Sequence, residues 1–382
     1  MELTASHNPQ QWNGLKCLLR NDLGLFGSSA CAPPAALAQQ IVDRFRTGTI
    51  PNAPWDRLGT VERDDTANIV HIERVLAALT DAGIAEDPQT LGEGLGVVLD
   101  SVNASGVEAG ATMLEQLGVQ ETLHLGCEDT GIFPHTPEPT LENLTLLAQA
   151  VRESDAAVGF AQDPDADRLA IIDETGTYIG EEYTLVLATL AILEAMKRRG
   201  ERTQGALLAV NLSTSRMIDD VAARFGARVL RTAVGEANVV EAMKTNACVV
   251  GGEGNGGIIW PRVTYVRDSL AGMGLVLSLL GNGRRTLSEV VATIPAYAIV
   301  KRKVDLSRKE DARPAVEKLA QAYAKERVDL QDGVRVDFDA RRAWLHVRAS
   351  NTEPIMRLIA EAPTAADAQN VLQDAERIIR GA

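Results

Sequence analysis

The spacing of apolar residues predicts two helices early in the chain and then a long alternation of strands and helices. The two helices are expected over residues 35–46 and 66–82, and the run Glu-Asp-Pro at 86–88 is typical of a linker. Beyond residue 95, apolar strand patterns at 96–100 and 156–160 enclose helical patterns around 108–117 and 141–152. This order predicts a βαβ unit.

The same alternation then restarts and gives way to a different pattern near the end of the chain. A second unit is expected from strands at 206–211, 228–230 and 248–251 and helices at 215–225 and 236–244. Strand patterns at 297–304, 334–338, 344–348 and 355–361, with helices at 313–326 and 365–379, indicate a small α+β domain with an antiparallel sheet. The predicted fold class is therefore α/β, with successive mixed-sheet α/β domains followed by this C-terminal domain. Whether the two central units are alike in structure stays open.

Composition places the chain among folded globular proteins and disfavours several kinds of partner. Its 382 residues suggest two to four domains, and 45% hydrophobic with 24% charged residues is ordinary globular usage. A net charge of -14 disfavours nucleic acid and anionic membranes, since both are bound through basic surfaces. No apolar run is long enough to cross a membrane, and the four cysteines lack metal-site spacing. Reduced thiols and a cytoplasmic location are expected.

Three carboxylates and an arginine form the strongest candidate for chemistry. Asp163, Asp165 and Asp167 alternate between two apolar strand patterns, and Arg168 follows them. Because side chains of a regular strand point to opposite faces, the three can converge only where the chain turns, as Pro164 favours. Convergent carboxylates need a cation, and an all-oxygen set suits Mg²⁺. A calcium EF-hand is excluded because Arg168 occupies the position that needs glycine, and a solvated acidic turn is the alternative.

A serine near the start of the chain is the candidate nucleophile. Ser6 precedes Asn8 and Pro9, a turn signal that exposes the hydroxyl group. His7 offers a base for Ser6, yet neighbours in sequence rarely face each other, and no third member of a catalytic triad can be placed. A serine hydrolase is therefore disfavoured, and an Asx-type turn or helix cap is the structural alternative.

Two further segments carry residue types that bind sugars and phosphates. Glycines crowd residues 251–257 after an apolar strand, which suits close approach of the backbone to a ligand, and Glu253 and Asn255 suit sugar hydroxyl groups. Arg348 begins the run Arg-Ala-Ser-Asn-Thr-Glu-Pro at a strand end, with Arg357 beyond it, and guanidinium groups bind phosphate oxygens in pairs. A loose loop and a surface turn are the respective alternatives.

Together these residues resemble the α-D-phosphohexomutase superfamily, which includes phosphoglucomutase, phosphomannomutase and phosphoglucosamine mutase. Four segments match in the family's order: the phosphoserine loop at 4–9, the magnesium loop at 163–168, the sugar-specificity loop at 252–257 and the phosphate loop at 348–354. The resemblance covers nearly the whole chain. It implies four domains, at 1–90, 91–198, 199–296 and 297–382, each carrying one of these loops.

The resemblance also implies a role for each matching residue. Ser6 would carry a phosphoryl group that Mg²⁺ bridges to Asp163, Asp165 and Asp167, so Ser6 would itself be a metal ligand. Ser6 would phosphorylate the free hydroxyl group of a hexose monophosphate, and the resulting bisphosphate would turn around and return its other phosphate. The metal and Arg168 would compensate the charge of the transferring group.

The remaining roles follow the same matches. The implied catalytic residues are Ser6, His7, Lys16 and Arg168, and the implied substrate-binding residues are Gly235, Glu253, Asn255, Arg267, Arg348, Ser350, Asn351, Thr352 and Arg357. As a general acid and base, Lys16 would need cationic neighbours that lower its pKa.

Two departures from the family pattern affect these expectations. The chain begins almost at the phosphoserine loop, so the first domain is expected to be incomplete, with an open sheet edge and uncovered apolar surface. Gly257 stands where many phosphomannomutase/phosphoglucomutase members have histidine, and Asn255 stands where serine is usual. This version of the loop favours a phosphoglucosamine mutase within the family. The alternatives are a phosphomannomutase/phosphoglucomutase and a non-catalytic sugar-phosphate-binding protein.

The resemblance finally implies the partners of the chain. They are hexose phosphate and hexose bisphosphate, with no nucleic acid and no membrane, and the chain is expected to be a monomer or homodimer.

Overall fold

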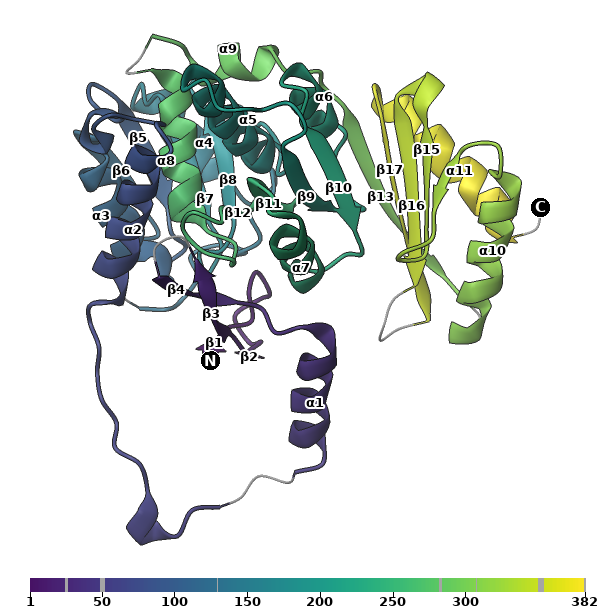
Figure 1. Ribbon diagram of the computed structural model, residues 1–382, viewed down its shortest axis with the longest axis horizontal. Helices are drawn as coiled ribbons and strands as arrows, with labels where there is room; N and C mark the ends of the chain where they lie inside the picture. The colour runs from purple at the N-terminus through teal and green to yellow at the C-terminus, as the bar shows by residue number, and fades with distance from the viewer. Residues whose placement is uncertain are drawn as a thin grey trace.

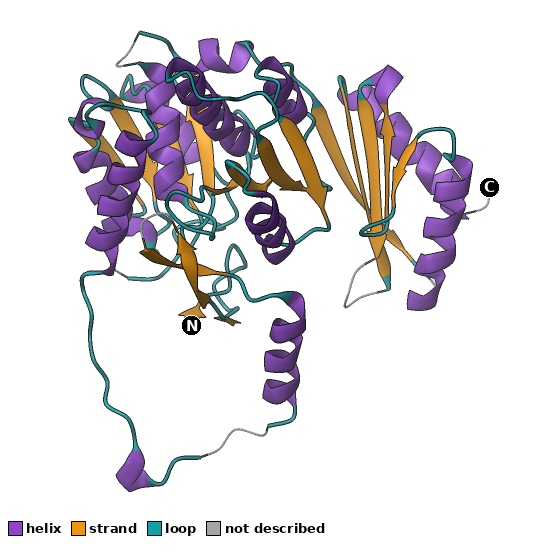
Figure 2. Cartoon of the chain, in the orientation of Figure 1, coloured by secondary structure: helices purple, strands orange, loops and turns teal. Residues whose placement is uncertain are grey.

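A computed structural model describes residues 1–24, 27–48, 52–128, 130–281, 284–306, 308–349 and 354–380. Its elements form four groups along the chain (Figure 1 and Figure 2). Among these residues, no helix is both long and apolar enough to pass through a membrane.

The N-terminal segment contains two short hairpins and an isolated helix. β1 (Glu2–Leu3) pairs with β2 (Leu15–Lys16), and β3 (Leu19–Gly24) pairs with β4 (Gly27–Cys31), both antiparallel. Helix α1 (Ala35–Arg46), at the predicted position, and a 3₁₀ turn (Trp55–Arg57) lie on a loop that extends away from the other elements (Figure 1). No residue of α1 is buried.

The apolar side chains of this segment agree with the expected uncovered surface. Trp12, Phe45 and Trp55 are exposed, and most of the exposed large hydrophobic side chains in the described residues lie before residue 71.

The two central sheets share one strand order and one pattern of directions. The second group contains α2 (Ala67–Asp81), a 3₁₀ turn (Pro88–Thr90), β5 (Gly96–Asp100), α3 (Gly106–Gln116), β6 (Glu121–Leu125), α4 (Thr145–Glu153), β7 (Val158–Gln162) and β8 (Leu169–Asp173). The third contains α5 (Tyr183–Arg198), β9 (Leu207–Asn211), α6 (Met217–Arg224), β10 (Arg228–Thr232), α7 (Glu236–Asn246), β11 (Val250–Glu253), β12 (Gly257–Ile259), α8 (Ser269–Leu280) and α9 (Leu287–Ala292).

The strand orders are β6-β5-β7-β8 and β10-β9-β11-β12. In each sheet the first three strands are parallel and the fourth is antiparallel. The expected mixed sheets are therefore confirmed, and the two central units are alike. The acidic run connects β7 to β8, and the glycine-rich run connects β11 to β12, so both candidate loops occupy the same hairpin of their units. The glycine-rich segment is a tight hairpin, because β11 continues to Glu253 instead of ending at the predicted position.

Helices α5 and α8 were not expected from the sequence. Both contact strands of the two central sheets, α5 through β8, β11 and β12, and α8 through β8 and β12. Almost every residue of α8 is buried, and so are most residues of α5. A helix buried on all sides lacks the polar stripe that identifies an amphipathic helix, which explains why the spacing of apolar residues did not reveal them. The two helices and both sheets share one hydrophobic core.

The C-terminal group is an antiparallel sheet with its own core, as predicted. It contains β13 (Ala298–Asp305), a 3₁₀ turn (Lys309–Asp311), α10 (Ala312–Ala322), β14 (Arg327–Asp329), β15 (Val334–Phe338), a 3₁₀ turn (Asp339–Arg341), β16 (Ala343–Ala349), β17 (Ile355–Ala362) and α11 (Ala365–Arg380). The strand order is β13-β17-β16-β15-β14. The apolar face of the sheet packs on α10 and α11, and this core is separate from that of the central groups.

The close approach of Gly118 to Gln89 in the second group can be tested by substitution. Gly118 follows α3 with a φ of +80°, and a Cβ atom there would lie 1.7 Å from the carbonyl oxygen of Gln89. Gly205 has a φ of +81° but no atom within 4 Å of its Cβ position. We expect Gly205→Ala to lower the free energy of unfolding by about 1 kcal/mol through backbone strain. We expect Gly118→Ala to lower it by about 1–3 kcal/mol more, because the methyl group also overpacks the site. Urea unfolding followed by circular dichroism measures both, and equal losses would contradict the close approach to Gln89.

Candidate active site

The turn between β7 and β8 brings three carboxylates together. Asp163, Asp165 and Asp167 each place one oxygen within 4.8 Å of the others. Both carboxylate oxygens of Asp165 and the Oδ1 atom of Asp167 are buried and accept no hydrogen bond from the described residues. Buried oxygens that lack donors and face one another fit a hard divalent cation. The loop could therefore hold a metal ion.

Burial and the neighbouring charges at this turn affect the ionisation of Asp163. Burial raises the pKa of Asp163 well above its ordinary value, and the neighbouring charges of Asp167 and Asp165 raise it further. Arg168 opposes this rise, because its backbone N–H donates to Asp163 Oδ1 at 3.1 Å and its Nε lies 3.6 Å from Asp163 Oδ2. A bound cation would, like Arg168, lower the pKa of Asp163.

A buried polar relay holds the backbone of this turn. Ala166 has a φ of +54°, in the left-handed region that a residue with a Cβ atom rarely adopts. Its carbonyl oxygen accepts a hydrogen bond from Ser269 Oγ at 2.6 Å, and Ser269 Oγ in turn accepts one from Gln162 Nε2 at 2.8 Å. The first turn of α8 and the end of β7 therefore fix the shape of the acidic loop.

The structure brings Ser6 next to the acidic loop. The Ser6 hydroxyl group lies 3.5 Å from Asp163 Oδ2, although 157 residues separate the two in the chain. Ser6 has a φ of +52°, and its backbone N–H donates to Thr4 Oγ1 at 2.8 Å. Thr4 itself closes the loop through a backbone hydrogen bond to Gly14 at 3.1 Å.

His7 differs from the sequence expectation. Neighbouring residues were expected to face apart, but the left-handed backbone of Ser6 turns the chain so that His7 Nδ1 lies 3.1 Å from Ser6 Oγ. Burial lowers the pKa of His7, and the charge of Arg168 lowers it further. On its other side, His7 Nε2 lies 3.9 Å from a carboxylate oxygen of Glu138.

Lys16 reaches the acidic loop, but its surroundings differ from the expected cationic ones. Its Nζ atom lies 2.8 Å from Asp167, 3.5 Å from Asp165 and 3.6 Å from Glu2. Burial alone would lower the pKa of Lys16, but the carboxylates of Asp167 and Asp165 outweigh burial and raise it. In this structure Lys16 therefore holds its proton firmly and pairs with the loop.

Arg267 connects the acidic loop to the glycine-rich hairpin. Its Nη2 atom lies 2.5 Å from Asp167 Oδ2, its Nε lies 2.9 Å from Glu236, and its Nη1 lies 3.7 Å from Glu253. Glu253 Oε1 also accepts a hydrogen bond from the backbone N–H of Gly235 at 3.2 Å. Three of the predicted substrate-binding residues, Gly235, Glu253 and Arg267, thus lie together beside the acidic loop.

The sequence reasoning missed two polar residues near the hairpin. Asn211 Nδ2 donates to Glu253 Oε1 at 2.9 Å from the carboxyl end of β9, the edge where ligands of parallel sheets usually bind. Glu182 is buried beneath Gly254, where a Cβ atom would lie 2.1 Å from its carboxylate, so a larger residue there would have to displace that carboxylate. Burial raises the pKa of Glu182 well above its ordinary value. The side-chain oxygen of Asn255 is buried and has no hydrogen-bond partner among the described residues.

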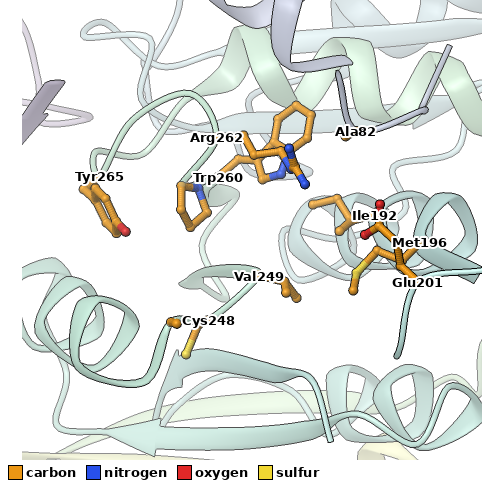
Figure 3. Close-up of a pocket in the computed structure, with 11 residues that line it drawn as sticks. Ala82, Ile192, Met196, Glu201, Cys248, Val249, Trp260, Arg262 and Tyr265 are labelled. Carbon is orange, nitrogen blue, oxygen red and sulfur yellow. The ribbon is translucent and has the colours of Figure 1, made fainter. Parts of the chain in front are cut away.

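Two cavities show where small molecules can enter. A cavity of about 370 Å³ is lined by Ser6, Lys16, Asp165 and Arg267. Another, of about 330 Å³, lies near Trp260 and is mostly apolar, with Arg262 and Glu201 as its charged lining residues (Figure 3). Its lining includes none of the predicted site residues. The first cavity is the candidate active site because four predicted site residues line it.

The predicted phosphate loop is only partly described. Ser350, Asn351 and Thr352 lie outside the described residues. Arg348 and Arg357 are direct partners across β16 and β17, so both side chains lie on one face of the C-terminal sheet. Arg357 is exposed, and Arg348 Nε lies 3.2 Å from Asp332 Oδ2. The contacts of the described residues do not connect either arginine directly to the acidic loop.

Three domain descriptions of one family match this chain. Phosphoglucomutase/phosphomannomutase alpha/beta/alpha domain II matches residues 72–176, alpha/beta/alpha domain III matches residues 185–297, and the C-terminal domain matches residues 300–378. None of the three reaches the segment that carries Ser6 and Lys16.

Relatives and a solved structure agree with this match. A probable phosphoglucosamine mutase of Methanopyrus kandleri is 34% identical over 382 residues, covering 99% of this chain and 78% of the relative. A phosphoglucomutase/phosphomannomutase of Thermococcus kodakarensis is 31% identical, covering 97% of this chain and 76% of the relative. A crystal structure of a family protein from Burkholderia thailandensis has the same fold, with a TM-score of 0.75 and 21% identity over 99% of this chain and 75% of that one.

The matched domains, the relatives and the shared fold lead to one assignment. The chain belongs to the α-D-phosphohexomutase superfamily, whose members are isomerases that act on hexose phosphates.

Proposed function

We propose that this chain is a Mg²⁺-dependent mutase that interconverts the 1-phosphate and 6-phosphate of a hexose through a phosphoserine at Ser6 and a hexose bisphosphate. The observation that carries the proposal is the position of the Ser6 hydroxyl group, 3.5 Å from a carboxylate of the acidic loop. A nucleophilic hydroxyl group beside an all-oxygen metal cradle is the arrangement that phosphoryl transfer requires.

The acidic loop supplies the metal ligands in this proposal. Asp163, Asp165 and Asp167, with an oxygen on Ser6, would hold Mg²⁺, and the ion when bound would neutralise charge on the phosphoryl group. Arg168 adds a fixed positive charge next to Asp163. Because the three carboxylates are buried, these charges act with little screening by water.

The chain's own residues direct the transfer. The phosphoryl group on Ser6 Oγ moves to the free hydroxyl oxygen of the sugar, the bond to Ser6 Oγ breaks, and the hydroxyl proton passes to a base in the cavity. Lys16 and His7 are the candidate proton carriers, since Lys16 lines the cavity and His7 contacts Ser6 Oγ. Lys16 can accept a proton only after it has lost its own. Its pKa must therefore fall during catalysis, which requires that the negative charge of the carboxylates beside it be neutralised or moved away.

The sugar and the distant phosphate are proposed to bind outside this cavity, at the glycine-rich hairpin and the C-terminal sheet. Glu253, fixed by Asn211 and Gly235, is available to sugar hydroxyl groups. Arg348 and Arg357 would hold the phosphate that is not reacting, with Ser350, Asn351 and Thr352 of the same predicted loop. One pocket would then serve both orientations of the bisphosphate.

Glucosamine phosphate is the proposed substrate. The loop version with Asn255 and Gly257 supports it, and the Methanopyrus kandleri relative carries a matching name. Glucose and mannose phosphates are the alternative, supported by the name of the Thermococcus kodakarensis relative. A cytoplasmic location and a monomeric or homodimeric state stay predictions.

One observation favours a second function, the binding of sugar phosphates without turnover. The segment that carries Ser6 and Lys16 also carries α1, which has no buried residue, and several exposed aromatic side chains. A catalytic hydroxyl group must be held to a fraction of an ångström, and a sparsely packed segment holds it less firmly. Calorimetry together with a turnover assay separates the two functions.

Removal of the proposed nucleophile is the first test. We expect Ser6→Ala to abolish interconversion of hexose phosphates, because the phosphoryl acceptor is lost, while sugar-phosphate binding persists. Turnover is measured by a coupled assay and binding by titration calorimetry. Ser154→Ala, an exposed serine at the end of α4, is the matched control and should retain full turnover. Undiminished turnover of Ser6→Ala would refute the phosphoserine role, and binding without turnover in the unaltered chain would favour the second function.

The metal site has a test that does not depend on activity. We expect Mg²⁺ to raise the thermal unfolding midpoint of the unaltered chain, since an ion that binds only the folded state stabilises it. Asp165→Asn should reduce this rise and increase the Mg²⁺ needed for half-maximal turnover by about tenfold or more, because the side chain loses its negative charge and one of two oxygens that accept no hydrogen bond from the described residues. Asp374→Asn on α11 removes an exposed charge and should leave both readings unchanged. A Mg²⁺ response that Asp165→Asn leaves intact would exclude the acidic loop as the metal site.

The substrate is tested by ranking kcat/KM. We expect glucosamine 6-phosphate to give the highest value, with glucose 6-phosphate and mannose 6-phosphate about tenfold or more lower, since polar contacts to the sugar discriminate strongly. Glu253→Gln should lower kcat/KM for all three sugars, because the hairpin loses its charged acceptor. A higher kcat/KM for glucose or mannose phosphate would overturn the choice of substrate and leave the mutase proposal in place.

A further inference from the structure

Polar side chains form the interface between the third group and the C-terminal sheet. The guanidinium group of Arg335 on β15 donates to the carbonyl oxygen of Leu212, and Glu361 Oε1 on β17 accepts from the backbone N–H of Arg216 at 2.9 Å. Trp344 Nε1 donates to the same Glu361 oxygen at 2.8 Å. The hydrophobic cores of the two groups remain separate. Hydrogen bonds therefore decide how the two groups are placed.

Asp332, in the turn before β15, contacts both groups at one atom. Its Oδ2 atom accepts a hydrogen bond from the backbone N–H of Val234 at 3.1 Å and lies 3.2 Å from Nε of Arg348. Val234 precedes Gly235, whose backbone N–H donates to Glu253 Oε1. A single carboxylate thus connects the phosphate-side arginine to the backbone segment that donates a hydrogen bond to the sugar-side glutamate.

A second route joins the same residues through the backbone of Asp332. His346 Nε2 lies 2.7 Å from the carbonyl oxygen of Asp332, and because a carbonyl oxygen only accepts, this nitrogen carries the proton. His346 Nδ1 then accepts from Ser213 Oγ at 2.8 Å. The backbone N–H of Ser213 donates to Asn211 Oδ1 at 2.8 Å, and Asn211 Nδ2 donates to Glu253 Oε1.

The ionisation of this histidine agrees with the relay. Burial lowers the pKa of His346 to about 4, so the ring is neutral at physiological pH and has one donor and one acceptor nitrogen. Both routes from Asp332 end at the same oxygen of Glu253.

We propose that Asp332 is a positioning residue that orients Arg348 for the non-reacting phosphate and couples it to the sugar-binding hairpin. This inference rests on the proposed function, in which Arg348 and Glu253 contact the substrate. The contact with Asp332 is an ion pair at Nε, without the geometry of a hydrogen bond, and the two terminal nitrogens of Arg348 can form a fork for phosphate oxygens. Asp332 acts through Arg348 and is not itself a catalytic residue.

The experiment is a double-mutant cycle on substrate binding. Asp332→Asn keeps an oxygen that can accept from Val234 but removes the charge that faces Arg348. We measure the dissociation constant of glucose 1,6-bisphosphate by calorimetry for the unaltered chain, Asp332→Asn, Arg348→Ala and the double variant. We expect Asp332→Asn to weaken binding by about tenfold, and to have no further effect once Arg348 is alanine. In turnover assays KM should rise by a similar factor, and kcat should change less.

Two further variants separate positioning from folding. Asp374→Asn, on the far helix of the same group, should bind like the unaltered chain. Arg348→Lys keeps the positive charge but offers one nitrogen in place of three, so it should weaken binding about as much as Asp332→Asn. If Asp332→Asn does not fold, as judged by its thermal unfolding midpoint, the lysine variant decides: binding equal to that of the unaltered chain overturns the inference.

The outcomes distinguish this inference from the proposed function. Turnover with bisphosphate binding unaffected by Asp332→Asn overturns the inference and leaves the mutase in place. Weaker binding that is undiminished in the Arg348→Ala background also overturns it, because Asp332 then acts through another group. Coupling between the two residues in a chain without turnover supports the inference and refutes the mutase. Absence of bisphosphate binding by the unaltered chain overturns both.

Discussion

Three carboxylates crowded at one buried turn must be balanced by positive charge, and much of the structure follows from this requirement. Like charges in a site of low dielectric repel strongly, and each cation brought in must give up water. Asp167 is contacted by Lys16, Arg168 and Arg267, which come from the N-terminal segment, the second group and the third group. One carboxylate therefore joins three parts of the chain that are far apart in sequence.

The same balance connects the acidic loop to the glycine-rich hairpin. The guanidinium group of Arg267 contacts Asp167, Glu236 and Glu253. The charge of the acidic loop therefore affects the electrostatics of the glycine-rich hairpin. Arg267 and Lys16 both contact Asp167 Oδ2, so a cation bound at the loop would lie close to their positive charges. The charges of the acidic loop and of the glycine-rich hairpin are thus linked through Arg267.

The sequence predicted those elements in which the spacing of apolar residues matches their surroundings in the folded chain. The strand Val334–Phe338 and the helix Ala35–Arg46 were predicted at their observed bounds. Helices α5 and α8 were missed because burial on every side removes the polar stripe, although both lie at the centre of the shared core. The spacing of apolar residues reveals a helix only where one face is apolar and the other polar, and these two helices have no such contrast.

Several residues that the sequence marked as a candidate site lie together in the structure, and their roles stay predictions. Residue type and order along the chain identified the acidic loop and Ser6. The contact between Ser6 and His7 was missed because it depends on a left-handed backbone at Ser6, and the acidic surroundings of Lys16 were missed because they come from distant segments. Asp332 and Asn211 had no motif to mark them, since their positions follow only from how the sheets meet.

The separate core of the C-terminal sheet has a mechanical consequence. A rigid-body rotation of this sheet would break hydrogen bonds that water can replace, and it would leave both apolar interiors intact. The spacing between this sheet and the third group could therefore change at little cost in free energy and without local unfolding.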